Sequence, residues 1–158
     1  MIRVLFICLG NICRSPMAEA IFRHIVTNNN LQDQFTIDSA GLGTWHIGNP
    51  PHQGTRKILD EKQISYEGQK ARKIEAEDGE KFDYIIAMDQ QNIDELQSIR
   101  QKHPDVVVKK LLDFVPDAKE ANVPDPYFAG NFDYTYELVE AGCQQLFNYI
   151  EEQHHLDD

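Results

Sequence analysis

The sequence predicts an α/β fold with a single domain, in which helices cover both faces of a four-stranded parallel sheet. The chain has 158 residues, a length that suits one domain with one core. Short apolar runs alternate with segments of helical period, and no repeat or change of composition divides the chain. Because parallel strands need crossover connections, this alternation favours a three-layer sandwich of the flavodoxin-like or Rossmann-like kind.

Composition and charge restrict the partners and the location. The 15 Lys and Arg residues against 26 Asp and Glu residues give a net charge of −11, which disfavours nucleic acid and anionic membranes. The apolar run at residues 4–9 is too short for a signal peptide, and no later run approaches a membrane span. Three cysteines cannot form a closed set of disulfides, which fits a reducing compartment. We therefore expect a cytoplasmic protein without membrane insertion.

The first half of the chain contains two predicted strands, each followed by a helix. Residues 4–7 form a continuous apolar run typical of a strand that is buried on both faces. Ser15 is a candidate N-cap because a proline follows it, and apolar residues then recur at helical spacing. Alternation over residues 35–38 predicts a second strand, and a loop rich in Gly and Pro at residues 42–51 leads to a helix around residues 58–59.

The second half continues the alternation. Residues 84–88 predict a third strand, after which Asp89 is a candidate N-cap for a helix that extends to Arg100. Apolar residues within 106–112 suggest a fourth strand. In open parallel sheets ligands bind beyond the carboxyl ends of the strands, so the loops after residues 7, 38, 88 and 112 should share one edge.

The chain ends on a long connection and a long helix. Residues 113–130 have no clear period, and a loop of this length is usually functional or mobile. We take residues 1–150 as the folded domain and expect the acidic end, residues 151–158, to fray. The closing helix has an apolar stripe formed by Phe132, Tyr136, Val139, Cys143, Leu146, Phe147 and Ile150.

The loop between the first strand and the first helix, CLGNICRS, carries the clearest chemistry. Its backbone N–H groups and the helix N-terminus would form a site for a tetrahedral anion, and Gly10 and Asn11 tolerate the left-handed backbone that such a loop needs. The same field favours the thiolate of Cys8, which is the nucleophilic form. Arg14 supplies a planar fork for two phosphate oxygens, and Ser15 can donate a hydrogen bond to the sulfur.

The segment from Val4 to Ala20, VLFICLGNICRSPMAEA, resembles the start of the low-molecular-weight protein tyrosine phosphatases. Further segments resemble that family's signatures in the right order, and the resemblance covers residues 1 to about 150. These segments are Ser39-Ala40-Gly41, Trp45, Met88-Asp89 with Asn92, and Asp125-Pro126-Tyr127.

The resemblance implies a cysteine phosphatase that uses no metal and no cofactor. In this family pattern Cys8 attacks phosphorus to form a phosphocysteine, Arg14 and the loop amides hold the phosphoryl oxygens, and Asp125 protonates the leaving phenolate. The substrates would be phosphotyrosine proteins or peptides, and inorganic phosphate would be the product.

The resemblance also implies a set of binding and supporting residues. The substrate-binding set is Leu9, Gly10, Asn11, Ile12, Cys13, Ser15, Trp45 and Tyr127, in which Leu9, Ile12, Trp45 and Tyr127 wall the cleft. The supporting set is Ser39, Asp89, Asn92 and Phe128, and Asn11 and Ser39 brace the loop by hydrogen bonds. Two residues depart from the pattern: Gln69 stands where several relatives have a histidine, and Phe128 replaces a second tyrosine of some relatives.

The residues themselves also call for an acid, because an alkoxide-like group leaves phosphorus slowly without a proton donor. Asp125 is the best candidate, since prolines on both sides stiffen its backbone; the alternative is a Pro-Asp-Pro turn without chemistry. Cys13 could protect Cys8 from over-oxidation by forming a disulfide, or it could simply pack. Asp89 could be an N-cap alone or could also orient Arg14 or Arg72. We assign no histidine to a metal.

Three other functions compete with the tyrosine phosphatase. A thiol-linked arsenate reductase resembles this loop but needs further cysteines, and none lies between residues 14 and 142. A protein arginine phosphatase resembles the loop with threonine where Ile12 stands, and isoleucine offers no hydroxyl to a guanidinium or water. A noncatalytic phosphopeptide-binding module would keep the anion site but would have no use for Asp125.

Overall fold

The computed structural model describes residues 1–156, apart from the side chain of Ala129. A four-stranded sheet in the order β2-β1-β3-β4 forms its centre, and every pair of neighbouring strands is parallel. Val4 pairs with Ile37 on one side and with Tyr84 on the other, so β1 is fully enclosed in the sheet. The strands are β1 (Ile2–Cys8), β2 (Phe35–Gly41), β3 (Tyr84–Ala87) and β4 (Val107–Lys110).

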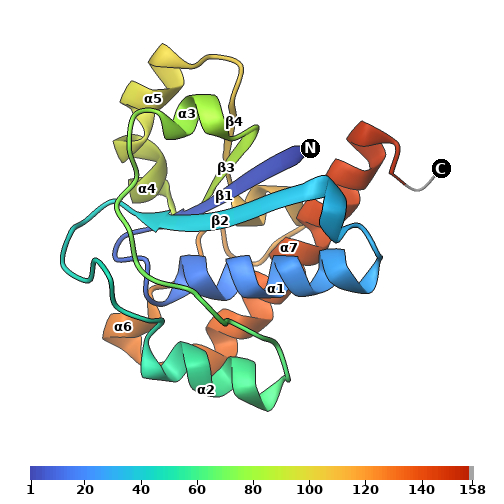
Figure 1. Ribbon diagram of the computed structural model, residues 1–158. Helices are drawn as coiled ribbons and strands as arrows, with labels where there is room; N and C mark the ends of the chain where they lie inside the picture. The colour runs from blue at the N-terminus through green and yellow to red at the C-terminus, as the bar shows by residue number, and fades with distance from the viewer. Residues whose placement is uncertain (157–158) are drawn as a thin grey trace.

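Helices cover both faces of this sheet, as Figure 1 shows. One face carries α1 (Arg14–Asn28), α2 (Gln53–Glu61), α6 (Pro126–Ala129) and α7 (Phe132–His154). The opposite face carries α3 (Asp78–Lys81), α4 (Gln90–Glu95) and α5 (Gln97–Lys102). Two short 3₁₀ turns, η1 (Gln32–Gln34) and η2 (Leu111–Phe114), join elements at the edges. The predicted three-layer α/β sandwich is therefore confirmed.

Alternate residues of the strands supply two separate cores, because successive side chains of a strand point to opposite faces. On the α1 and α7 face, Phe6 and Phe22 meet edge to face with centroids 5.6 Å apart, and Phe22 also meets Phe147 at 6.3 Å. On the other face, Leu5 and Ile7 pack with apolar residues of α4 and α5 and with Leu96, which lies between these two helices. This burial on both faces explains why β1 reads as one continuous apolar run.

The N-cap predicted for the first helix is wrong. The helix begins at Arg14, and its N-cap is Cys13, which makes no side-chain capping bond. Ser15 lies in the first turn, where its hydroxyl contacts the sulfur of Cys8 and accepts a hydrogen bond from Asn11. The hydroxyl serves the loop that precedes the helix, so it is not free to cap the helix end.

Three boundaries in the second half also differ from the sequence prediction. The single helix expected from Asp89 to Arg100 is divided at Leu96, where ψ of 2° leaves the helical range between α4 and α5. The fourth strand ends at Lys110, because residues 111–114 form the 3₁₀ turn η2 and bury Leu111 and Leu112. The one-turn helix α3 was not predicted, since four residues are too few for a period.

The last helix extends further than the boundary at residue 150 that the sequence suggested. It continues to His154, whose Nε2 lies 2.9 Å from the hydroxyl of Tyr84, and Leu156 packs against the core. These contacts hold residues 151–154 in the helix, while residues 157–158 of the expected frayed end lie outside the described residues. Within residues 1–156, no helix is long and apolar enough to cross a membrane.

Candidate active site

The loop between β1 and α1 wraps around the sulfur of Cys8 at the carboxyl edge of the sheet. Cys8 is the last residue of β1 and is 3% exposed. The backbone N–H of Asn11 donates to its Sγ at 3.3 Å, and the Oγ of Ser15 lies 3.0 Å from the same atom. Asn11 adopts φ of 57°, the left-handed conformation that turns this N–H inward, whereas Gly10 has no positive φ. Of the two predicted left-handed residues, Asn11 alone adopts that conformation.

The side chain of Asn11 fastens this loop to the neighbouring strand. Its Nδ2 donates to Ser15 Oγ at 2.8 Å and to Ser39 Oγ at 3.0 Å, and Ser39 donates in turn to the buried carboxylate of Glu19 at 2.7 Å. Its Oδ1 accepts the backbone N–H of Arg72 at 3.0 Å. Hydrogen bonds from the side chain of Asn11 thus join the loop to Ser39 and to the backbone of Arg72.

Arg14 lies in the first turn of α1 with 2% of its surface exposed. Its Nη1 donates to Asp89 Oδ2 at 2.6 Å and to the carbonyl of Val123 at 2.9 Å, and its Nη2 lies 3.5 Å from Asp125 Oδ2. Its Nε is buried and has no hydrogen-bond partner among the residues the structure describes. A buried donor without a partner is costly, and this one lies at the end of the loop that the sequence predicts to bind an anion.

The charges near Arg14 keep it protonated. Burial tends to lower the pKa of its guanidinium, but Cys8 and the carboxylate of Asp89, with a further contribution from Asp125, raise the pKa above its ordinary value. The guanidinium therefore carries its positive charge at physiological pH, and it can balance the charge of a thiolate or another anion.

Asp89 has both of the roles that the sequence left open with respect to Arg14. It caps α4 by accepting the N–H of Asn92 at 2.8 Å, while Asn92 Oδ1 accepts the N–H groups of Met88 and Asp89. The same carboxylate holds Arg14 through its other oxygen. Asp89 does not contact Arg72, which pairs with Asp38 and Asp78.

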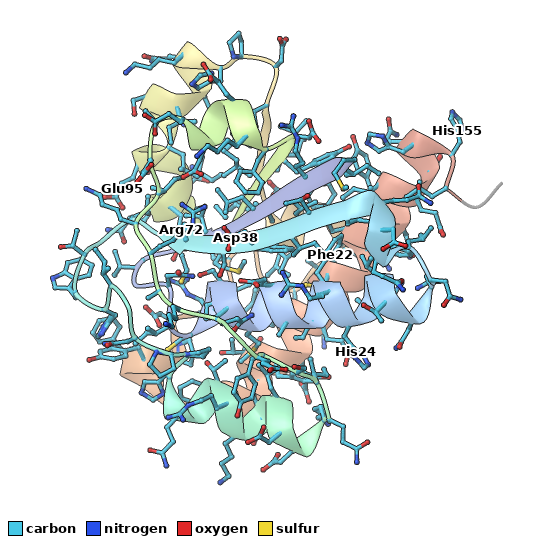
Figure 2. All side chains as sticks on the ribbon, viewed as in Figure 1. Phe22, His24, Asp38, Arg72, Glu95 and His155 are labelled. Carbon is cyan, nitrogen blue, oxygen red and sulfur yellow. The ribbon has the colours of Figure 1, made fainter. Side chains whose placement is uncertain are left out.

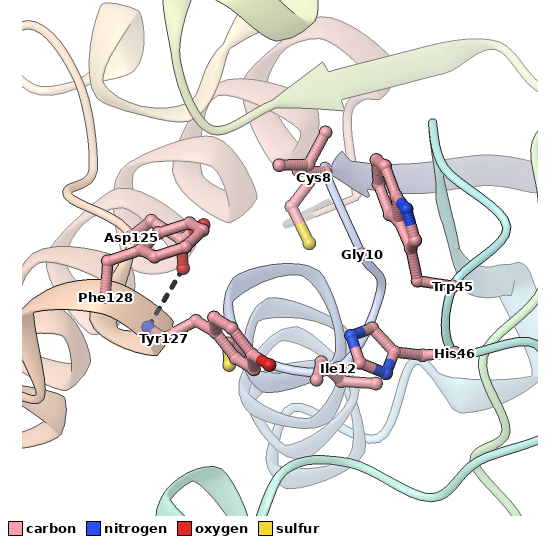
Figure 3. Close-up of a pocket in the computed structure, with 10 residues that line it drawn as sticks. Cys8, Gly10, Ile12, Trp45, His46, Asp125, Tyr127 and Phe128 are labelled. Carbon is pink, nitrogen blue, oxygen red and sulfur yellow. Dashed lines mark hydrogen bonds between the residues drawn. The ribbon is translucent and has the colours of Figure 1, made fainter.

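Asp125 is presented by the connection after η2, at the N-terminus of the short helix α6. Its Oδ1 accepts the backbone N–H of Tyr127 at 3.0 Å, so the carboxyl is held at the mouth of the pocket with 23% of the side chain exposed. Figure 3 shows Asp125 and Tyr127 on one side of the sulfur of Cys8 and Trp45 on the other. Pro124 and Pro126 restrict the backbone on both sides.

These groups surround a pocket of about 300 Å³ with mainly apolar walls. Trp45 and Phe128 form part of its rim, and they are 68% and 77% exposed. The ring of His46 lies 5.9 Å from that of Tyr127. The pocket is lined by Cys8, Leu9, Gly10, Ile12, Cys13, Trp45, His46, Asp125, Tyr127 and Phe128. The lining residues thus follow β1, β2 and β4, and the loop after β3 contributes Asp89, which holds Arg14.

The other two cysteines differ from Cys8 in their surroundings. Cys13 is the N-cap of α1, and burial, followed by the nearby Cys8 and Asp125, raises its pKa to about 12. Its thiol is therefore protonated at neutral pH. Cys143 is fully buried in α7, where its thiol donates to the carbonyl of Ala18 at 3.6 Å, and burial raises its pKa as well. The core position predicted for Cys143 is confirmed.

Four contributors to the site were missed from the sequence. Glu19 and the carbonyl of Val123 bond to members of the loop network, Arg72 holds Asn11 through its backbone, and His46 lines the pocket. Glu19 had a usable signal, because a carboxylate within the apolar stripe of a helix needs a partner. The backbone groups of Arg72 and Val123 give no side-chain signal.

Together the fold and the site define a class. A thiol is held between loop amides, a helix N-terminus and a buried arginine, and a carboxyl lies across the pocket; this is the arrangement of a cysteine-dependent phosphatase.

The comparisons with known proteins identify the family. The model of the family described as low molecular weight phosphotyrosine protein phosphatase matches residues 3–156. The chain belongs to this family and is a low-molecular-weight protein tyrosine phosphatase, a hydrolase of phosphomonoesters.

Individual relatives agree over nearly the whole length. The chain is 51% identical over 156 residues to the low molecular weight protein-tyrosine-phosphatase YfkJ of Bacillus subtilis, covering 99% of this chain and 100% of that protein. It is 46% identical over 150 residues to PtpA of Staphylococcus aureus, covering 95% of this chain and 94% of that protein.

Solved structures show the same fold. The crystal structure of YfkJ superposes with a TM-score of 0.94 at 51% identity, over 97% of this chain and 96% of that one. A protein tyrosine phosphatase of Entamoeba histolytica, with Hepes in its active site, superposes with a TM-score of 0.88 at 33% identity. The superposition covers 97% of this chain and 99% of that one. The fold is therefore the Rossmann-like fold of this family.

Proposed function

We propose that this protein removes phosphate from phosphotyrosine in proteins or peptides, with Cys8 as the nucleophile, Arg14 as the phosphate clamp and Asp125 as the general acid and base. The observation that carries the proposal is the position of Cys8. Its sulfur accepts the N–H of Asn11 and contacts Ser15 at the floor of a pocket, and the buried Nε of Arg14 has no partner among the described residues. No metal or cofactor takes part in the proposed reaction.

In the first step the thiolate of Cys8 attacks phosphorus and the bond from phosphorus to the phenolic oxygen breaks. A proton from Asp125 goes to that oxygen, so a neutral phenol leaves and a phosphocysteine remains. Because Asp125 Oδ1 accepts the N–H of Tyr127, Oδ2 is the oxygen that would carry the proton. Arg14 and the loop amides hold the phosphoryl oxygens, whose charge is greatest in the transition state.

In the second step water attacks phosphorus and Asp125 accepts its proton. The phosphorus–sulfur bond breaks, the electron pair returns to Cys8, and inorganic phosphate leaves. The oxygens that Arg14 and the loop amides hold are the same in both steps, so one site serves both transition states. The sum of the steps is hydrolysis of a phosphomonoester to a phenol and phosphate.

The walls of the pocket support an aromatic substrate. Trp45 and Tyr127 stand on opposite sides of Cys8, where a phenyl ring between them would remove apolar surface from water (Figure 3). A phosphoserine side chain has no ring to fill this space. Ile12 lines the pocket and offers no polar group, which favours a phenyl ring over a guanidinium.

The cysteines support two further proposals. All three thiols are free and buried, and we infer a cytoplasmic location because reducing conditions keep thiols in this state. Cys13 does not act as the nucleophile in this proposal, because its thiol is protonated and a thiol must ionise to attack. The protective disulfide between Cys8 and Cys13 under oxidation stays a prediction.

The test is a turnover assay on phosphotyrosine, phosphoserine and phosphoarginine peptides of one sequence, measured as phosphate release for the wild type and Cys8→Ser. We expect kcat/KM to be highest for phosphotyrosine and turnover to vanish in Cys8→Ser, because an alcohol replaces the thiolate. Preference for phosphoarginine would replace the proposed substrate, and an active Cys8→Ser would reject the nucleophile. Binding of phosphotyrosine peptide without turnover by the wild type would indicate the noncatalytic module.

A further inference from the structure

Behind the loop lies a group of three charges that the proposed reaction does not use. The guanidinium of Arg72 donates to Asp38 Oδ2 at 3.1 Å through Nε, and to the two oxygens of Asp78 at 3.1 and 3.2 Å through Nη1 and Nη2. Asp38 belongs to β2 and Asp78 begins α3, so the arginine joins two elements. Figure 2 shows Arg72 and Asp38 together beside β2.

The backbone of Arg72 continues this connection to the catalytic loop. Its carbonyl accepts the N–H of Gly41 at 2.8 Å, and the N–H of Ile74 donates to the carbonyl of Gly41 at 2.8 Å, so the segment pairs with the end of β2. The N–H of Arg72 donates to Asn11 Oδ1 at 3.0 Å. Arg72 thus contacts the loop through its backbone, and it contacts β2 and α3 through its side chain.

The hydrogen bond from the backbone N–H of Arg72 decides which way the side-chain amide of Asn11 points its N–H donors. An amide side chain can turn over by half a rotation, which exchanges its oxygen and nitrogen. With the oxygen held by the N–H of Arg72, the nitrogen faces Ser15 and Ser39, as observed. Ser15 can then turn its own proton toward the sulfur of Cys8, because its oxygen already accepts from Asn11.

We propose that Arg72 is a positioning residue for the phosphatase reaction, which holds Asn11 in the orientation that lets the loop stabilise the thiolate of Cys8. This inference rests on the proposed function of Cys8 as the nucleophile. Arg72 does not line the pocket, so it acts through Asn11 and not on the substrate.

The guanidinium adds a side-chain anchor to the backbone hydrogen bonds that already tie this segment to Gly41, Gly48 and Asn49. Asp78 is 3% exposed and also accepts the N–H of Glu75 at 2.7 Å, so its carboxylate is fixed in place. An arginine pairs with both oxygens of this carboxylate, and a lysine would make a single contact. Removal of the guanidinium leaves the buried carboxylate of Asp78 without its ionic partner, and the N–H of Arg72 is then positioned by the backbone hydrogen bonds alone.

The test compares Arg72→Gln and Arg72→Lys with the wild type, and Arg3→Gln is the matched control. Arg3 also forms an ion pair, with Asp83 at 2.9 Å, but it lies at the amino end of β1, away from the pocket. Two quantities are measured: the rate at which iodoacetamide alkylates Cys8 as a function of pH, and kcat for an aryl phosphate. Mass spectrometry confirms that Cys8 is the alkylated residue, and thermal unfolding records stability.

We expect the midpoint of the alkylation profile in Arg72→Gln to move about half a unit to one unit to higher pH, because the thiolate loses part of its hydrogen bonding. We expect kcat to fall about tenfold, the effect of one buried hydrogen bond, while KM changes less because Arg14 and the loop amides remain. Arg72→Lys should lie between Arg72→Gln and the wild type, and Arg3→Gln should match the wild type. The other charged or titratable groups near the sulfur, Cys13, Arg14 and Asp125, are unchanged in all three variants.

A purely structural role predicts a different result: a lower melting temperature in Arg72→Gln with an unchanged alkylation midpoint and kcat, which would overturn the inference. An equal shift in Arg3→Gln would overturn it as well. If Arg72→Gln does not fold, Asp78→Asn is measured in its place, because it weakens the same ion pair. The inference then requires that Asp78→Asn also moves the midpoint of the Cys8 alkylation profile to higher pH. Failure of the proposed function is separate, because the wild type itself would then show no alkylation at Cys8 or no hydrolysis.

Discussion

The two oxygens of Asp125 have different neighbours. Oδ1 accepts the N–H of Tyr127 at 3.0 Å, whereas Oδ2 lies 3.5 Å from Nη2 of Arg14. In the proposed reaction, Oδ2 is therefore the oxygen that would carry the proton.

Replacement of Asp125 by Asn should slow substrates in proportion to their need for a proton. General acid catalysis is worth ~10²–10⁴-fold, so we expect that order of loss in kcat/KM for an aryl phosphate with a basic phenol and a much smaller loss for an acidic nitrophenol. The basic limb of the pH profile should also flatten. Rates are measured for both substrates at several pH values.

The alternative is that the substitution only loosens the Pro-Asp-Pro turn. Asparagine is nearly the same shape and can still accept the N–H of Tyr127, so it keeps the turn. Equal losses for both leaving groups, with an unchanged basic limb, would remove Asp125 as the acid and direct attention to Asp89.

At the level of elements, the site depends on the close contact between the end of β2 and the loop after β1. A Cβ on Gly41 would lie 3.0 Å from Asn11 Cβ, 3.1 Å from Asn11 N and 3.1 Å from Gly10 C. Two of these are backbone atoms of the loop, which cannot rotate away as a flexible side chain can. A side chain at residue 41 would therefore require the loop to shift by a few tenths of an ångström.

Gly41→Ala should consequently push the loop away from β2. We expect a loss of ~1–3 kcal/mol in the free energy of unfolding, typical of overpacking. We also expect kcat to fall about tenfold, because the shift lengthens the hydrogen bond from the N–H of Asn11 to the sulfur of Cys8. Denaturant unfolding and steady-state kinetics measure the two effects. Wild-type kinetics in a folded Gly41→Ala variant would show that this contact does not shape the loop.

The elements with strong patterns could be predicted from the sequence, and those decided by tertiary contacts could not. The apolar run of β1 and the stripe of α7 are buried as expected. The division between α4 and α5 at Leu96 was invisible, because Ile93, Leu96 and Ile99 all pack on the sheet and keep a helical spacing across the break. Ser15 was misjudged because a serine before a proline is a good cap by local rules, and here a sulfur competes for its hydroxyl.

The same distinction holds for the site. Cys8 ends β1 and Arg14 begins α1, on the two sides of one short loop, so their proximity follows from strand and helix placement alone. Asp125 was found through the need for an acid and through the family resemblance. Arg72 could not be found, because its contact with Asn11 uses a backbone N–H that every residue other than proline has.

Over the whole molecule, the carboxyl ends of the strands and their amino ends differ in what they contribute: the first form the site, and the second carry an ion pair. All four strands point their carboxyl ends toward the pocket, where buried polar groups are concentrated. At the amino ends, Arg3 and Asp83 join β1 to the residue before β3 by backbone and side-chain hydrogen bonds. Burial tends to raise the pKa of Asp83, but the hydrogen bonds from Arg3 outweigh it and lower the pKa.

This pair should make a small, pH-dependent contribution to stability. Because the pKa of Asp83 is lower in the folded protein, the contribution is complete above the ordinary value of 3.8 and disappears as the pH falls through the lowered value. Both side chains are more than a third exposed, so we expect Asp83→Asn to cost only ~0.2–1 kcal/mol at pH 7. Urea unfolding from pH 7 down to acid pH measures the difference. A difference that grows toward acid pH would contradict the assignment.

The central claim of the account is that phosphate passes through the sulfur of Cys8, and a trapping experiment tests it most directly. The wild type and Cys8→Ser are mixed with a radiolabelled aryl phosphate and quenched rapidly during turnover, and the labelled residue is identified by mass spectrometry. The account predicts a phosphoryl group on Cys8 in the wild type and no labelled protein in Cys8→Ser. Label on another residue, or turnover by Cys8→Ser, would contradict it.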